Sequence, residues 1–205
     1  MSFRAMTGCM LAIGLVLSTG CSKGPARLHP PSIDASGAGS QAMEMYDADH
    51  DGKISGAELD KCPALKAAIK QIDPSGENAI TAAKITSRIK QWQDSKLGRM
   101  SMSCTVLRNG RPLANADVNF VPEKFLGENV KTATGKTDKN GVAMISVPTK
   151  DRSDPPGVAP GLYRVEVTKA GEKIPAKYNT ETTIGQEVAL DAEGIQKGIR
   201  FDLKY

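Results

Sequence analysis

The chain has 205 residues, which is enough for one large domain or two small ones. Apolar residues make up 40% and charged residues 24%, as in ordinary globular proteins, but aromatic residues are only 4%, so a core has to rest on aliphatic side chains. The 27 basic and 23 acidic residues give a net charge of +4 without any basic run, which excludes a nucleic-acid-binding protein.

Residues 1–20 predict an export signal, because Arg4 precedes an apolar stretch that is too short to span a membrane. The stretch ends in LSTGC, which resembles a bacterial lipobox. The resemblance implies cleavage before Cys21 and its lipidation, and hence a membrane-anchored lipoprotein of the periplasm or outer surface. Ser18 stands where a lipobox usually has Leu, and Ser18 and Gly20 also suit ordinary signal peptidase, so plain secretion is the alternative. Both alternatives place the protein outside the cytoplasm.

Residues 21–40 are rich in Gly, Pro and Ser and predict a disordered tether. Residues 41–98 then show the spacing of amphipathic helices. A capping box of Ser55 and Glu58 opens one helix, and Pro63 favours the start of another. The helices have two apolar stripes at i, i+4 and i+7, formed by Leu65, Ile69 and Ile72 and by Ile85, Ile89 and Trp92.

The segment 47–58 reads DADHDGKISGAE and matches the EF-hand calcium loop at every defined position. Calcium is a hard cation that takes about six to eight oxygen ligands, and alternating carboxylates in a tight loop supply them. The glycine allows the turn, and the last residue gives two oxygens from the following helix. The alternative is a solvated acidic turn. The predicted ligands of Ca²⁺ are Asp47, Asp49, Asp51, the carbonyl group of Lys53, Ser55 through a water, and Glu58.

A second loop, residues 73–84, repeats the register of the first. Lys84 takes the position of Glu58, so a cation replaces the carboxylate that would bind calcium through both oxygens. Asn78 replaces the turn glycine, which Asn tolerates because it accepts positive φ. We therefore expect the second loop to pair with the first, through Ile54 and Ile80, and to bind no ion.

From about residue 101 the apolar period changes from that of a helix to two residues, which is typical of strands. Turn signals such as Asn109-Gly110 and Asn140-Gly141 separate the runs. About seven short strands in residues 101–205 indicate an antiparallel β-sandwich. The predicted fold class is thus α+β with two domains, a small helical pair at 41–98 followed by the sandwich.

Both regions resemble known families. Residues 41–98 resemble a bacterial EF-hand pair. Residues 101–205 resemble the carboxypeptidase-regulatory-like, or transthyretin-like, β-sandwich in the stretches RPLANADVNFVPE, TGKTDKNGVAMISVP, PGLYRVEVT and GIRFDLK. The combination is similar to small exported bacterial lipoproteins. Because an extracytoplasmic compartment permits disulfides, Cys62 and Cys104 either form a bridge between the two domains or remain buried free thiols.

Catalysis is not expected. The only histidines are His29 and His50, so a nucleophile within the strand region has no histidine base. The remaining candidates are paired carboxylates, if Asp117, Glu166 or Asp202 meet in space.

The predicted function is calcium binding by an interaction or scaffold protein that is tethered to a membrane or secreted. The alternative is a sandwich that itself binds a polysaccharide or a protein, with calcium purely structural. Aromatic side chains that could stack on sugars are few in this region, namely Phe125, Tyr163 and Tyr178, and each is equally suited to a structural place.

Overall fold

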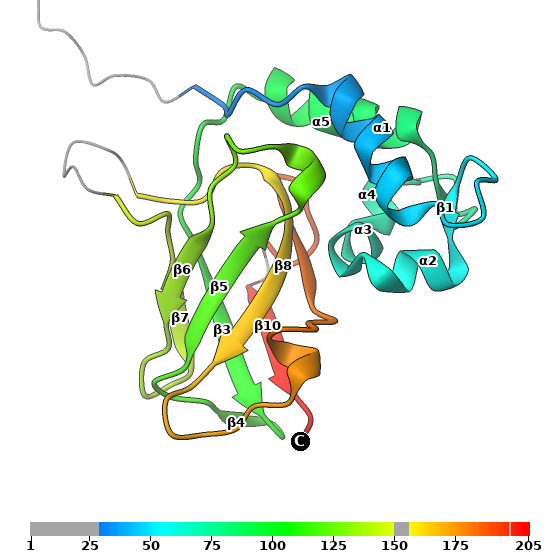
Figure 1. Ribbon diagram of the computed structural model, residues 1–205. Helices are drawn as coiled ribbons and strands as arrows, with labels where there is room; N and C mark the ends of the chain where they lie inside the picture. Colours follow the sequence, from blue (N-terminus) through cyan, green and yellow to red (C-terminus); the bar gives the residue numbers. More distant parts are fainter. Residues whose placement is uncertain (1–28, 150–155, 197) are drawn as a thin grey trace, which may run out of the picture.

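The computed structural model describes residues 29–149, 156–196 and 198–205. The predicted signal at 1–20 and the lipidation site Cys21 lie outside these residues. The fold is a mixed α+β arrangement, in which the helices gather beside one end of the β-sheets and the C-terminus lies near the opposite end (Figure 1). No helix in the described ranges has both the length and the apolar character that crossing a bilayer would require.

The helices occupy the first half of the described chain, as the apolar stripes predict. Pro63 is the first residue of its helix, and Ile85, Ile89 and Trp92 form the buried face of the longest one. The helices are α1 (Ala35–Tyr46), α2 (Gly56–Lys61), α3 (Pro63–Ala67), α4 (Ile69–Ile72) and α5 (Ala82–Asp94), with short 3₁₀ turns η1 (Lys124–Leu126) and η2 (Ala176–Tyr178) among the strands.

The strands form a two-stranded ribbon and two four-stranded sheets. The ribbon joins β1 (Ile54–Ser55) to β2 (Ala79–Ile80). One sheet contains β3 (Met102–Arg108), β4 (Arg111–Pro112), β7 (Val142–Ile145) and β10 (Ile199–Leu203). The other contains β5 (Asp117–Pro122), β6 (Ala133–Lys136), β8 (Gly161–Thr168) and β9 (Gly185–Val188). A bridge between Thr134 and Ser146 connects the two sheets along one side.

One strand pair departs from the predicted antiparallel arrangement. β10 pairs with β3 in parallel, from Ile199 beside Cys104 to Leu203 beside Arg108. The period-two pattern identified both strands, but alternation is the same for either direction, so it carries no information about orientation.

The predicted tether at 21–40 is too long at its C-terminal end, because α1 begins at Ala35. The Asp34 side chain caps this helix by accepting the N–H of Gly37 at 3.0 Å. Small residues line the face of α1 that packs on α5: a Cβ at Gly39 would lie 2.6 Å from the carbonyl oxygen of Ala82. The Gly and Ser residues that suggested a linker therefore allow two helices to approach closely.

The helices and sheets share a continuous hydrophobic core. Backbones meet most closely where α3 packs on β9, since a Cβ on Gly185 would lie 1.9 Å from the carbonyl oxygen of Pro63. Only a glycine fits at this contact without displacing one of the two elements. The helical region is thus packed directly against the sheets through α3.

Candidate metal centre

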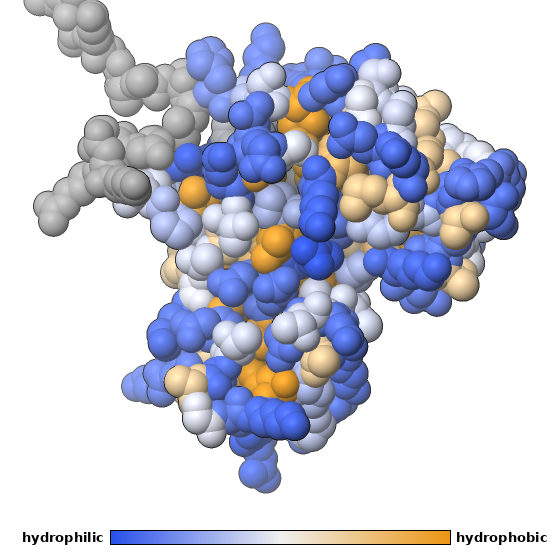
Figure 2. Space-filling model, in the orientation of Figure 1, coloured by the Kyte–Doolittle hydropathy of each residue, from blue (hydrophilic) through white to orange (hydrophobic). Residues whose placement is uncertain are grey.

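The 47–58 loop lies between two helices, as its motif predicts. α1 ends at Tyr46, the loop turns at Gly52, and β1 leads into α2. Gly52 has a φ of 85°, and its N–H donates to Oδ2 of Asp47 at 3.1 Å. Hydrophilic residues cover the projecting tip of the helical region, where this loop lies (Figure 2). The loop therefore presents its polar groups at an accessible end of the molecule.

Three of the predicted ligands converge. Carboxylate oxygens of Asp47, Asp49 and Glu58 all lie within 4.8 Å of one another. Asp47 is buried, with 7% of its surface exposed, and its Oδ1 has no hydrogen-bond partner. Leaving a buried carboxylate oxygen unpaired is costly, so this atom fits a cation. Oxygen donors of this type suit a hard ion such as Ca²⁺.

Glu58, at the twelfth position, closes the loop. Its Oε1 accepts the N–H groups of Ala48 at 2.6 Å and Asp49 at 3.3 Å, and its Oε2 accepts the N–H of Ser55 at 3.2 Å. These backbone donors, that of Ala48 foremost, hold the pKa of Glu58 below its ordinary value. The carboxylate thus stays ionised and joins the first turn of α2 to the start of the loop.

The remaining predicted ligands lie on the same loop but outside the converging three. Oδ1 of Asp51 accepts the N–H of Lys53 at 2.8 Å, and Oδ1 of Asp49 accepts the N–H of Asp51 at 3.2 Å. Ser55 is half-buried at the end of the β1 strand, where it pairs with Ala79. Asp51 would need a change in its side-chain direction to join Asp47, Asp49 and Glu58.

The second loop pairs with the first, as expected from its register. β1 and β2 run antiparallel with Ile54 opposite Ile80 and Ser55 opposite Ala79, and both isoleucines are fully buried. Asn78 has a φ of 53°, which is the left-handed conformation expected at the position of the missing glycine. The ribbon connects the two loops directly behind the candidate site.

A buried polar cluster connects the loop to the sheets. The hydroxyl of Tyr46 donates to Oε2 of Glu123 at 3.0 Å, and the Tyr46 ring meets Phe125 edge-on at 6.4 Å between centroids. Glu123 is 2% exposed and its Oε1 has no partner. Burial raises the pKa values of Tyr46, Cys62 and Glu123 alike. No local sequence signal pointed to Glu123, because its partner lies 77 residues away.

Of the two alternatives for Cys62 and Cys104, the disulfide is not formed, and both cysteines are buried free thiols. Cys62 follows α2 and lies in the cluster with Tyr46 and Glu123. Cys104 belongs to β3, which pairs with β7 and β10 in one of the sheets, and burial raises its pKa to about 12. The two thiols thus have different surroundings. A disulfide requires two cysteines in close and specific geometry, and an oxidising compartment alone does not provide it.

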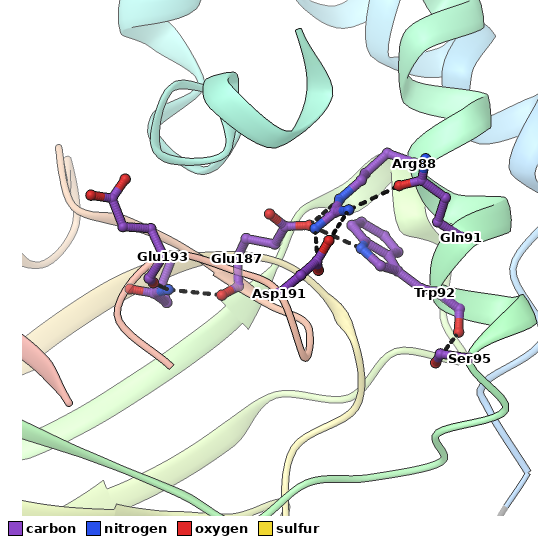
Figure 3. A network of polar contacts seen from close by, with 8 residues as sticks. Arg88, Gln91, Trp92, Ser95, Glu187, Asp191 and Glu193 are labelled. Carbon is purple, nitrogen blue, oxygen red and sulfur yellow. Dashed lines mark hydrogen bonds and ion pairs between the residues drawn. The ribbon is translucent and has the colours of Figure 1, made fainter. Parts of the chain in front are cut away.

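A second polar network joins α5 to β9 and the segment after it (Figure 3). The buried Arg88 donates from Nε to Oε1 of Glu187 at 2.6 Å and from its two terminal nitrogens to Asp191 at 2.8 and 2.9 Å. Trp92 donates from its indole nitrogen to the same Glu187 oxygen at 2.9 Å. The network thus attaches α5 to the sheet that contains β9, in addition to the contact of α3 with the same strand. The sequence pattern predicted the apolar stripe of α5 but not the role of Arg88.

The alternative sites take structural places instead. Asp117 forms an ion pair with Lys136, and Asp202, in the other sheet, with Lys204. Among the described residues no aromatic side chain is exposed, and the three candidates for sugar stacking are all buried: Phe125, Tyr163 and Tyr178. Asp117 and Asp202 therefore do not pair with each other, and the three rings lie in the interior.

No protein family, curated protein or solved structure matches the chain.

Proposed function

We propose that the protein binds Ca²⁺ through its 47–58 loop and acts outside the cytoplasm as an interaction or scaffold protein. The observation that carries the proposal is the buried Oδ1 of Asp47, which has no hydrogen-bond partner. The carboxylates of Asp49 and Glu58 lie close to that of Asp47. A bound cation would satisfy this oxygen. Asp51, the carbonyl of Lys53 and Ser55 are the further ligands of the proposed site.

The donor set favours calcium over other common ions. Zinc sites usually include His or Cys, whereas the converging groups are all carboxylates. Magnesium demands a compact octahedron and keeps several waters, whereas calcium accepts many ligands in a flexible geometry. Extracellular calcium modules bind with dissociation constants of about 10⁻⁴–10⁻³ M. A site of that strength would remain loaded outside the cell and would stabilise the fold.

The sheets supply the interaction part of the proposal. We take residues 101–205 as a transthyretin-like domain of the sandwich type and residues 41–98 as an EF-hand pair that packs on it through a shared core. Lipidation of Cys21 would tether the protein to a membrane surface. A protein partner is favoured over a polysaccharide, because the described residues expose no aromatic ring on which a sugar could stack.

Calorimetric titration of the purified protein with CaCl₂ tests the calcium site. We expect one ion to bind the wild type, and Asp47→Asn and Glu58→Gln to abolish or strongly weaken binding. Glu44→Gln is the matched control, because it removes one exposed negative charge just before the loop without touching the site. Unchanged binding in Asp47→Asn and Glu58→Gln, or a wild type that binds no calcium, would refute the proposal.

A further inference from the structure

The second loop contains a cation of its own. The ammonium group of Lys84 lies 2.8 Å from Oδ1 of Asp73, 3.2 Å from Oε2 of Glu77 and 3.0 Å from the carbonyl oxygen of Ala79. The Asp73 side chain is fully buried, whereas 27% of the Lys84 side chain is exposed. Lys84 thus reaches inward from the first turn of α5 to a carboxylate that has no access to water.

The β1–β2 ribbon aligns these contacts with the first loop. Since Ile80 stands opposite Ile54, Asp73 corresponds to Asp47, the first proposed ligand. In the same register Glu77 corresponds to Asp51 and Ala79 to Lys53, whose carbonyl group is a proposed ligand. Each oxygen that the Lys84 ammonium contacts is therefore the equivalent of an oxygen that Ca²⁺ would take in the 47–58 loop.

We propose that the Lys84 ammonium group occupies the cation position of the second loop and holds that loop permanently in its closed form. The part of this inference that concerns the first loop depends on the proposed function. Lys84 would be a positioning residue, because it contacts Ala79, and Ala79 pairs with Ser55 at the start of the helix that carries Glu58. A closed second loop would keep β1 in place before any calcium arrives, and so spare the first loop that ordering cost.

The electrostatics of Asp73 support this arrangement. Its hydrogen bonds with Lys84 first, and with Ser75 next, lower the pKa of Asp73 to about 2. Oδ2 of Asp73 also accepts the N–H of Ala79 at 3.4 Å. A buried carboxylate of this kind requires a partner cation. Lys84 of the same chain provides that cation, so no free ion is needed.

Calorimetric titration with CaCl₂ on three variants of the whole protein tests the inference. Lys84→Met removes the ammonium group, and we expect it to weaken calcium binding about 10- to 100-fold, as loss of a supporting contact behind a metal ligand does. Lys84→Glu restores the missing carboxylate, and we expect the number of bound ions to rise from one to two. Lys90→Met, which removes an exposed lysine from the same helix, should bind as the wild type does.

A stoichiometry of one in Lys84→Glu with normal helical circular dichroism would overturn the assignment of the cation position. Wild-type affinity in Lys84→Met would overturn the positioning role. If Lys84→Met does not fold, Lys84→Glu still tests the assignment of the cation position. In that variant a calcium ion bound to the second loop would take the place of the ammonium group and close the loop. If the wild type binds no calcium but Lys84→Glu binds one ion that Asp73→Asn removes, the proposed function fails while the assignment of Lys84 holds.

Discussion

Tyr46, the last residue of α1, donates a hydrogen bond of 3.0 Å to Glu123, which directly follows β5. Tyr46 also directly precedes Asp47, the buried carboxylate of the candidate metal centre. The proposed calcium ligand is therefore the direct neighbour in sequence of a residue that makes a buried contact with the sheets. A change in the loop cannot move α1 without affecting this contact.

Replacing Tyr46 by Phe is expected to reduce the free energy of unfolding by about 1–3 kcal/mol, because the buried Glu123 carboxyl loses the Tyr46 hydroxyl as a donor. Chemical denaturation followed by circular dichroism measures the change. Tyr205→Phe is the control: Tyr205 also donates to a carboxylate, Glu172, but that group keeps its contacts with Arg108 and Lys169. A loss in Tyr46→Phe no larger than that in Tyr205→Phe would contradict the structural importance of the contact.

The buried Glu123 should make stability depend on pH. Burial raises its pKa above the ordinary 4.5, so the unfolded chain loses this proton at a lower pH than the folded protein. The folded state then binds more protons, and the free energy of unfolding falls as the pH rises from 4.5 through the higher pKa of the folded state.

Glu123→Gln removes that proton and should flatten this decline, while its amide oxygen still accepts from Tyr46. Part of the slope should remain, because burial also raises the pKa of Glu187. Denaturation curves between about pH 4 and pH 8 test this, with Glu44→Gln as the exposed control. An unaltered slope in Glu123→Gln would show that Glu123 does not titrate as described.

Arg88→Met is expected to cost about 3–5 kcal/mol of stability, because it leaves the buried Glu187 without its counter-ion. Asp191 is largely exposed and can return to water. The double variant Arg88→Met/Glu187→Gln should recover part of the loss, since the amide carries no charge and still accepts from Trp92. The same stability in the single and double variants, measured by thermal unfolding, would argue against an unpaired charge as the cause.

The two thiols should behave as buried, unpaired groups. We expect the native protein to react slowly with a thiol reagent at both Cys62 and Cys104 and the denatured protein to react at once, because burial and a raised pKa suppress the thiolate. Peptide mapping without a reductant gives the second measurement. A peptide that joins Cys62 to Cys104 would show a bridge between them and contradict the structure.

Local patterns predicted much of this structure and long-range contacts account for most of what was missed. The loop motif, the helix start at Pro63 and the pairing of Ile54 with Ile80 depend on residues close together in sequence, so they could be inferred directly. The partners of Tyr46 and Arg88 lie 77 and 99 residues away. Spacing along a strand or helix cannot indicate which distant carboxylate meets them.

Composition misled at one boundary. Residues 35–40 are small and polar enough to suggest the end of a tether, yet they form the first half of α1, since Gly39 is small enough for α5 to pack against it. The direction of β10 and the state of the two thiols also depend on how the whole chain is arranged. Within the candidate site, the motif named Asp47, Asp49 and Glu58, whose carboxylates the structure brings together, but the unpartnered oxygen of Asp47 depends on burial, which the motif does not show.

The close approach of Pro63 to Gly185 joins the start of α3 to β9 with almost no space between the backbones. A rigid seam of this kind transmits small displacements, as packed interiors do in general. If calcium shifts α2 and, through Cys62, also α3, then β9 must shift with α3 or this contact must open. Calcium binding to the loop would then change the position of β9 in the sheet, without a flexible hinge between the two.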